Sequence, residues 1–272
     1  MGRAILEIKD IQKSFALNFS TKKNAGIEYR NVLENLNLEI ERGQVTALVG
    51  GNGAGKTTLF NLVSGLLKAD SGTILFFGHK KTLNCTRVYP WETAAAGIGR
   101  LFQAPKVFDS CTVLEHLMLQ GTPANLEWPF RSMIRHKKFR EKRRKFVGYI
   151  EDALAPFAAM KQLLENPDIP ASSLSYAQQR LLSLAGLIVG GYELLLLDEP
   201  SSGLSEDSII TLNATVNHLK QEGKSIFIIE HNMEVVRNLA DQCHYLSEGC
   251  IKHSGSAEAV LSESEVLQSY LL

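Results

Sequence analysis

Hydrophobic and polar residues follow two different patterns along the chain. Between positions 36 and 41 apolar residues alternate with polar ones. This period of two predicts a strand with one face exposed to water, as in an antiparallel sheet. The runs 45–49, 194–197 and 226–229 are instead almost continuously apolar, and stretches that can form helices precede the last two. Such runs predict strands buried on both faces of a parallel sheet, so we expect an α/β fold with a doubly wound core and an additional antiparallel β segment.

The middle of the chain has a different character. Thr112 and Glu115 have the spacing of a helix-capping box, and residues 131–164 have a helical composition that ends at Asn166 and Pro167. These features predict an inserted helical subdomain. We therefore expect a single domain over residues 1–272 in three parts, which are an α/β core (1–102 and 181–250), a helical subdomain (103–180) and a C-terminal helical tail (251–272).

The composition excludes several classes of protein. With 44% hydrophobic and 21% charged residues, the chain can bury a sizeable core, which excludes disordered and collagen-like chains. Lys and Arg total 29, as do Asp and Glu, so no overall positive charge favours nucleic acid as a partner. We interpret the basic segment 135–145 as a solvent-exposed helix face, with contact to anionic lipid or to a partner as the alternative.

Several features favour a cytoplasmic location. The four cysteines have neither a redox nor a metal-binding spacing, which is typical of a reducing compartment. The apolar stretch near the N-terminus is too short for a signal peptide. Residues 181–197 are the most apolar segment, but serine, glycines and glutamate interrupt it too often for a membrane span.

The first candidate site is a glycine-rich loop. Residues 50–57 match the pattern G-x-x-x-x-G-K-S/T, between a predicted buried strand and a helix that Gly65 can end. Its glycines allow backbone N–H groups to converge on phosphate oxygens, and the helix N-terminus adds favourable dipole charge. We expect Lys56 to contact the β and γ phosphates and Thr57 to coordinate Mg²⁺. The residues expected to bind a nucleotide here are Gly50, Gly51, Asn52, Gly53, Ala54, Gly55, Lys56, Thr57 and Thr58.

Two carboxylates follow the apolar run 194–197. In open α/β sheets ligands bind at the carboxyl ends of the strands, where Asp198, Glu199, His231 and the loop 50–55 would all emerge. Phosphoryl transfer requires charge neutralisation and an oriented nucleophile. We therefore expect Asp198 to bind Mg²⁺ and Glu199 to polarise a water molecule.

Further motifs occur along the chain in a characteristic order. They are Phe102-Gln103, the segment Leu174–Arg180 (the signature segment), Leu197–Pro200, Ser201–Ser205 and Glu230-His231. Together with the loop 50–57, these motifs resemble the nucleotide-binding subunits of ABC transporters over essentially the whole chain. The resemblance implies a P-loop ATPase fold. It also implies a dimer in which each of two ATP molecules lies between one subunit's phosphate loop and the other's signature segment.

The resemblance assigns roles to individual residues. It makes Glu199, His231 and Gln103 catalytic, with His231 sensing the γ-phosphate and Gln103 sensing both Mg²⁺ and the coupling segment. The residues implied to bind Mg²⁺ are Thr57, Gln103 and Asp198, and those implied to contact the partner's ATP are Ser175, Ala177 and Gln178.

The aromatic residue that stacks on adenine is less well defined. Phe15 resembles it in position, but the connection 16–30 is longer than is usual in the family. Phe19 or Tyr29 can therefore take this place, and Phe15 can instead be an ordinary core or surface residue.

Several stretches resemble one branch of the family in particular. The segments 97–103, 114–116, 229–233 and 266–271 are similar to those in ATPases of importers for branched-chain amino acids, urea and related small polar compounds. This resemblance implies import by two permeases, two ATPases and an extracytoplasmic binding protein. It places the chain at the cytoplasmic face of the membrane, with ATP and Mg²⁺ as cofactors, and leaves the cargo open.

The signature segment departs from the family pattern at Ala177. Tyr176 and Ala177 stand at two positions that are glycine in most members, and tyrosine at the first is familiar in this branch. At the second, alanine adds a Cβ where the backbone approaches phosphate and makes any required positive φ unfavourable. A displacement near 1 Å can cost about a hundredfold in rate, so we expect Ala177 to slow hydrolysis unless it is accommodated. A heterodimer with a different ATPase would then provide one strong site.

Two other functions stay open. A regulatory subunit would bind ATP with little hydrolysis, as Ala177 allows. A soluble ABC-type ATPase acting on DNA or ribosomes usually carries two cassettes or a long coiled coil, and neither occurs in this sequence.

Overall fold

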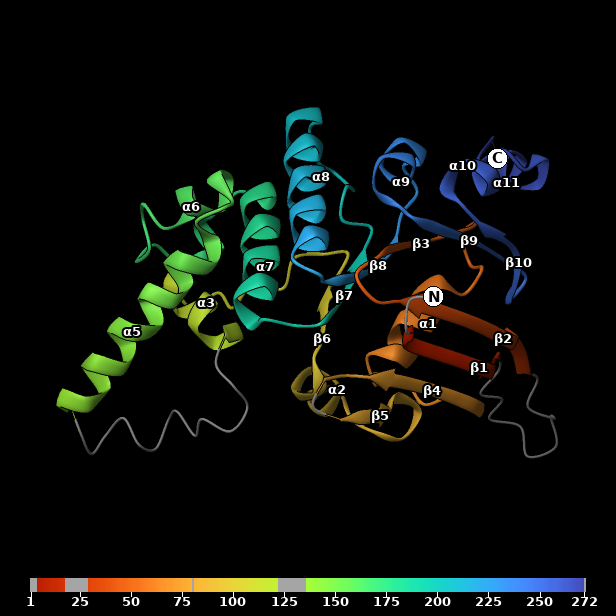
Figure 1. Ribbon diagram of the computed structural model, residues 1–272, viewed down its shortest axis with the longest axis horizontal. Coiled ribbons are helices and arrows are strands. Elements are labelled where there is room, and N and C mark those ends of the chain that lie inside the picture. The colour runs from red at the N-terminus through yellow and green to blue at the C-terminus, as the bar shows by residue number, and fades with distance from the viewer. Residues whose placement is uncertain (1–3, 18–28, 80, 122–135, 272) are drawn as a thin grey trace.

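Two β-sheets and the helices packed on them form the protein (Figure 1). The computed structural model describes residues 4–17, 29–79, 81–121 and 136–271. Within this part the strands are β1 (Ala4–Ala16), β2 (Tyr29–Glu41), β3 (Val45–Val49), β4 (Ser71–Phe77), β5 (Thr82–Asn84), β6 (Ile98–Leu101), β7 (Leu194–Asp198), β8 (Ser225–Ile229), β9 (Gln242–Ser247) and β10 (Cys250–Gly255). The α-helices are α1 (Lys56–Val63), α2 (Pro90–Ala96), α3 (Val113–Gly121), α5 (His136–Leu154), α6 (Ala158–Leu163), α7 (Tyr176–Gly190), α8 (Glu206–Gln221), α9 (Met233–Leu239), α10 (Ala257–Leu261) and α11 (Ser264–Leu271); the 3₁₀-helices are η1 (Cys85–Arg87) and η2 (Ala171–Ser173).

The smaller sheet confirms the antiparallel segment predicted from the alternating pattern. Its strands lie in the order β2-β1-β4-β5, and each neighbouring pair is antiparallel. The apolar positions Leu36, Leu38 and Ile40 are buried, and they belong to the same core as Leu59 and Phe60 of α1. This sheet therefore covers the helix that follows the phosphate-binding loop.

The larger sheet confirms the doubly wound core. Its order is β10-β9-β3-β8-β7-β6, and all pairs are parallel except β10 with β9. Every residue of β3, β7 and β8 is buried, as the continuous apolar runs predict. In β7, Leu195 and Leu197 pack into one core while Leu194 and Leu196 pack into the other. The carboxyl ends of β3, β8 and β7 therefore lie side by side at one edge.

A group of helices forms the inserted subdomain at the left of Figure 1, where α3, α5 and α6 pack against α7. The predicted capping box is present, because the backbone N–H of Thr112 donates to Glu115 (2.9 Å) and that of Glu115 donates to the Thr112 hydroxyl (3.2 Å). Residues 131–135, with Arg135 of the basic segment, lie outside the described residues, as do the side chains of 136–142. The interpretation of the basic segment thus stays a prediction.

Two expected boundaries differ in the structure. The helical subdomain was expected to end at residue 180, but α7 continues to Gly190 and packs against α3 and α5 along with its signature residues. The helical tail was expected from residue 251, but residues 250–255 form β10, which pairs with β9. Composition did not mark where α7 ends, and the strand at 250–255 depends on pairing with β9, which composition does not show.

Two further observations concern location. No helix among the residues that the structure describes is long and apolar enough to cross a membrane. All four cysteines are free, two of them buried.

Candidate nucleotide-binding and catalytic site

The loop between β3 and α1 is open on one side and tightly packed on the other. Gly53 and Gly55 have φ values of 77° and 108°, which side chains with a Cβ rarely adopt. A Cβ on Gly55 would lie 2.6 Å from a methyl of Leu33, whereas a Cβ on Gly51 or Gly53 would meet nothing within 4 Å. The loop therefore leaves room for a ligand beside its backbone N–H groups and the N-terminus of α1, which suits phosphate.

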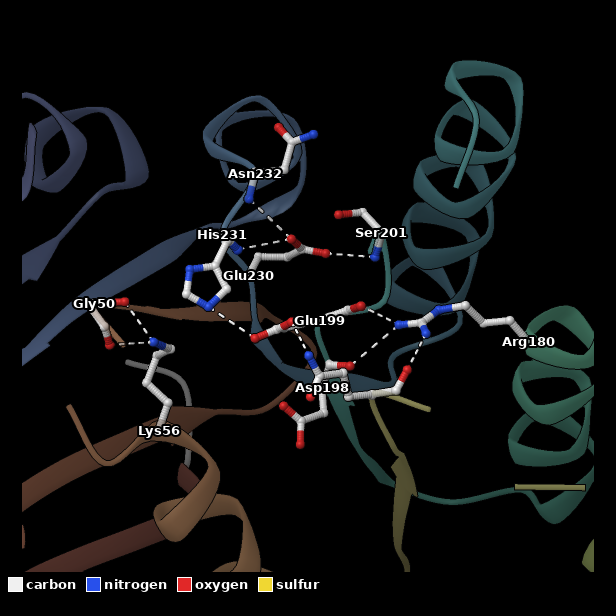
Figure 2. A network of polar contacts seen from close by, with 11 residues as sticks. Gly50, Lys56, Arg180, Asp198, Glu199, Ser201, Glu230, His231 and Asn232 are labelled. Atoms are coloured by element: carbon white, nitrogen blue, oxygen red, sulfur yellow. Dashed lines mark hydrogen bonds and ion pairs between the residues drawn. The ribbon is translucent and has the colours of Figure 1, made fainter. Parts of the chain in front are cut away.

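Lys56 is held across this loop. Its ammonium donates to the carbonyl oxygen of Gly50 (2.6 Å; Figure 2). It also donates to the carbonyl oxygen of Gly51 (2.9 Å). Burial lowers the pKa of Lys56, and the carboxylates of Glu199 and Asp198 act in the opposite direction. A buried cation at the mouth of a glycine-rich loop is well placed to bind phosphate oxygens.

The structure brings together the three residues expected to be catalytic. The side-chain amide of Gln103 donates to Oε2 of Glu199 (2.6 Å). On the other oxygen of this carboxylate, Oε1, Nε2 of His231 lies at 3.0 Å (Figure 2). The side chains of Glu199 and His231 are 21% and 35% exposed, so a small ligand can reach them. A carboxylate held from both sides in this way can orient a water molecule and accept its proton.

Asp198 ends β7 beneath this cluster. It is 4% exposed, and Arg100 of β6 lies 2.8 Å from its Oδ2 atom. The donors expected for Mg²⁺ are its carboxylate, the Thr57 hydroxyl at the start of α1 and the Gln103 amide oxygen. This set of hard oxygen donors beside a phosphate site has the chemistry that Mg²⁺ prefers, so the residues present fit the ion.

Two buried groups that the sequence analysis missed fix the loops around the site. Arg180 of α7 donates to the carbonyl oxygens of Pro200 (2.8 Å), Gln103 and Glu199. The carboxylate of Glu230 accepts from the backbone N–H groups of Ser201 (2.8 Å), His231 (3.0 Å) and Asn232 (3.2 Å). Figure 2 shows both networks on either side of Glu199.

Arg100 was also missed as a site residue. One feature of the sequence indicates both Arg100 and Arg180, because each is a charged residue inside an otherwise apolar element. Arg100 stands in β6 between buried residues, and Arg180 is 3% exposed in a mostly apolar helix. Asp198 lies 98 positions from Arg100, and the carbonyl oxygens that Arg180 contacts lie 18 to 77 positions from it, which the sequence does not indicate.

The signature segment begins α7 with a capping box. The hydroxyl of Ser175 accepts from the N–H of Gln178 (3.3 Å), and the Gln178 side chain accepts from the N–H of Ser175 (3.0 Å). Ala177 is the second residue of the helix, is exposed and does not have a positive φ. The structure therefore requires no positive φ at Ala177, and slower hydrolysis through a Cβ close to the phosphate stays a prediction.

The aromatic candidates for adenine stacking lie where the C-terminal end of β1 pairs with the N-terminal end of β2. Phe15 is 39% exposed with the Lys13 ammonium 5.3 Å from its ring centre, and Tyr29, opposite Ala16, is 61% exposed. Phe19 lies outside the described residues. Phe15 and Tyr29 thus both present a ring to solvent, and stacking on adenine stays a prediction for either.

Comparison with known proteins gives consistent results. The profile of the ABC transporter family matches residues 33–202. The chain is 30% identical over 240 residues to the high-affinity branched-chain amino acid transport ATP-binding protein LivG of Escherichia coli K12, covering 88% of this chain and 91% of the relative. It is 31% identical over 246 residues to the ribose import ATP-binding protein RbsA of Streptococcus agalactiae serotype Ia, covering 90% of this chain and 44% of that protein.

Solved structures agree with this similarity. The ADP conformation of an ATP-binding cassette of an ABC transporter superposes with a TM-score of 0.77 at 28% identity and covers 99% of both chains. A nucleotide-free cassette from an ABC transporter gives a TM-score of 0.75 at 28% identity and covers 98% of this chain and 99% of the other.

Proposed function

Because the chain belongs to the ABC transporter family and is an ABC-type ATPase, we propose that it hydrolyses Mg²⁺-ATP to drive the import of amino acids or related small polar compounds. The observation that carries this proposal is the convergence of Lys56, Gln103, Glu199 and His231 at the carboxyl edge of the large sheet. Both curated relatives above are named as transport ATP-binding proteins, which supports a transport role.

The residues at this edge divide the work of hydrolysis. The loop 50–58 and Lys56 hold the phosphates, and Thr57, Gln103 and Asp198 would hold Mg²⁺. When bound, Mg²⁺ neutralises charge that develops on the phosphoryl oxygens. Glu199 orients the attacking water and accepts its proton, while His231 steadies that carboxylate and faces the γ-phosphate.

A second ATP-binding chain completes the proposed assembly. Ser175, Ala177 and Gln178 at the exposed start of α7 would contact ATP held by that chain. A helix N-terminus with an exposed first turn favours phosphate. Backbone strain at Ala177 no longer supports a heterodimer, so this proposal rests on the Cβ of Ala177 beside the phosphate and on the paired ATPases of the resembled importers.

A groove with an aromatic rim supports a membrane-embedded partner. Pro90 of α2, Phe102 after β6 and Phe108 line it between the core and the helical subdomain. Beside Pro90, the rings of Tyr89 and Trp91 stack at 4.6 Å and are 51% and 65% exposed. Exposed apolar patches of this kind mark interaction sites, and we assign this one to permease subunits at the cytoplasmic face of the membrane. An extracytoplasmic binding protein would join through the permeases, and nucleic acid is not a proposed partner.

Reconstitution tests this function. The chain, purified through a tag together with its membrane complex, is placed in liposomes, and ATP-dependent uptake of labelled leucine, urea and ribose is compared. Uptake of leucine or urea supports the proposal. Uptake of ribose alone supports transport but replaces the proposed substrate class. If the tagged chain is purified without any membrane protein, the transport role is refuted. Trp91→Ala should weaken assembly at the aromatic rim, whereas Leu267→Ala, which trims an exposed apolar residue of α11, should not.

A further inference from the structure

Arg100 forms a buried ion pair with the proposed metal ligand. Arg100 lies in β6 next to β7, and its Nη2 atom is 2.8 Å from Oδ2 of Asp198. Both side chains are only 6% exposed. A cation of the chain itself therefore already binds one oxygen of the carboxylate that the proposed function gives to Mg²⁺.

The guanidinium is fixed from several sides. Its Nη1 atom donates to Oδ1 of Asn61 in α1 (2.7 Å) and to Oγ of Ser64, the residue that caps the end of α1 (2.9 Å). Its central carbon lies 4.7 Å from the ring centre of Phe102 and 5.6 Å from that of Phe60. The Nε atom is buried without a hydrogen-bond partner among the described residues. Arg100 thus occupies one orientation and keeps one polar group unsatisfied.

Stability alone is a poor reason for such an arrangement. The desolvation of two buried charges commonly cancels most of their attraction. The position of the pair is more informative, because α1 begins with Lys56 and Thr57 and β6 leads directly to Gln103. Arg100 therefore contacts the elements that carry every proposed metal ligand.

We propose that Arg100 is a positioning residue that weakens the affinity of Asp198 for Mg²⁺. The inference rests on the proposed function, in which Asp198 binds the ion. Arg100 fixes the rotamer of Asp198 and cancels its charge, so the chain by itself attracts the cation weakly and takes it up together with the nucleotide phosphates. Because an ionised carboxylate has two acceptor oxygens, Asp198 can keep the guanidinium on one and bind the metal through the other.

The sign of the effect follows from electrostatics. A guanidinium that hydrogen-bonds a carboxylate must lie within a few ångströms of any cation on the same carboxylate, and it repels that cation. Removing the positive charge should therefore tighten Mg²⁺ binding, and charge interactions at such distances support a change of at least about tenfold. A residue that only stabilised the fold would weaken metal binding when removed.

Binding of ADP by calorimetry measures this effect without hydrolysis. The dissociation constant of ADP is determined with excess EDTA and with excess Mg²⁺. The value in EDTA divided by the value in Mg²⁺ is the ratio of interest, because it reports the Mg²⁺ affinity of the protein–ADP complex relative to that of ADP in solution. The variants are Arg100→Gln, Arg100→Met, Arg100→Lys and Asp198→Asn. Arg144→Gln is the matched control, because Arg144 is exposed on α5 and its loss changes the net charge equally.

We expect the ratio to rise at least about tenfold in Arg100→Gln. The same rise is expected in Arg100→Met, whose apolar side chain suits a site beside two phenylalanine rings. This second variant tests the inference if the Arg100→Gln protein does not fold. Arg100→Lys, which keeps the charge, and Arg144→Gln should stay within about threefold of wild type.

The outcomes separate the two proposals. If Asp198→Asn lowers the ratio while the neutral Arg100 variants leave it unchanged or reduce it, Arg100 does not weaken Mg²⁺ binding and only that inference is lost. If Asp198→Asn leaves the ratio unchanged, the proposed metal role of Asp198 fails as well. A rise in Arg100→Lys as large as in Arg100→Gln would also overturn the inference, because the charge would then be irrelevant.

Discussion

Replacing Ala177 by glycine decides whether the altered signature segment slows hydrolysis. Ala177 is the second residue of α7, is exposed and has a helical backbone between the two members of the capping box. Glycine therefore relieves no strain and costs about 0.5–1 kcal/mol of helix stability. In a chain of this size the cost corresponds to a melting temperature lower by about 1–4 °C. We expect ATP hydrolysis within about twofold of wild type, whereas release of a misplaced phosphate contact would raise it by about a hundredfold.

The assay is Mg²⁺-dependent ATP hydrolysis over a range of protein concentrations, for the chain alone and for its membrane complex, with thermal melting in parallel. Ala158→Gly is the control, because Ala158 is exposed in the first turn of α6 and its replacement carries the same helix cost. A tenfold or greater acceleration in Ala177→Gly, absent from Ala158→Gly, would refute the reasoning. It would show that the Cβ itself obstructs the phosphate and would favour a heterodimer with a different ATPase.

Three further predictions follow from the contacts around the site. Lys56→Ala should abolish measurable ATP binding in calorimetry, since the cation held over the loop carbonyls is lost; undiminished affinity would remove Lys56 from the site. Glu199→Gln should retain ATP but reduce the hydrolysis rate at least about a hundredfold, because the amide cannot accept the proton, and normal turnover would contradict this role. Arg180→Lys should lower the melting temperature and the hydrolysis rate together, since one ammonium cannot reach the carbonyls that the guanidinium joins; a variant with wild-type values for both would show that these bonds contribute little.

The strands of the core could be predicted because their burial shows in the local pattern of apolar residues. The runs 45–49, 194–197 and 226–229 became β3, β7 and β8, and the alternation over 36–41 became the end of β2. The boundary at 251 was wrong for the opposite reason. Residues 250–255 carry a mixed pattern, and their strand exists because β9 provides a partner.

The candidate site divides in the same way. The loop 50–57 and Asp198-Glu199 lie at the ends of elements that the pattern defines, so their meeting at one edge follows from strand direction. Strand direction also places His231 at this edge, but the contact of Gln103 and His231 with one carboxylate depends on β6, β7 and β8 being neighbours, an order that the sequence pattern does not indicate. Arg100 reaches Asp198 only because β6 lies beside β7 in the sheet, and the sequence does not indicate that these two strands are neighbours.

The contacts of Arg180 connect the signature segment to the catalytic carboxylate. Arg180 lies in the second turn of α7, and the carbonyls that it binds come from the loops after β6 and β7. Glu199 has a φ of 46°, which few residues with a Cβ adopt and which persists only where the surroundings hold it. One of those surroundings is the guanidinium on the Glu199 carbonyl, and another is the bond from its N–H to the carbonyl of Ile229 (2.9 Å). A movement of α7 relative to the sheet therefore acts directly on the backbone that aims the carboxylate, so the position of the helical subdomain and the geometry of hydrolysis are not independent.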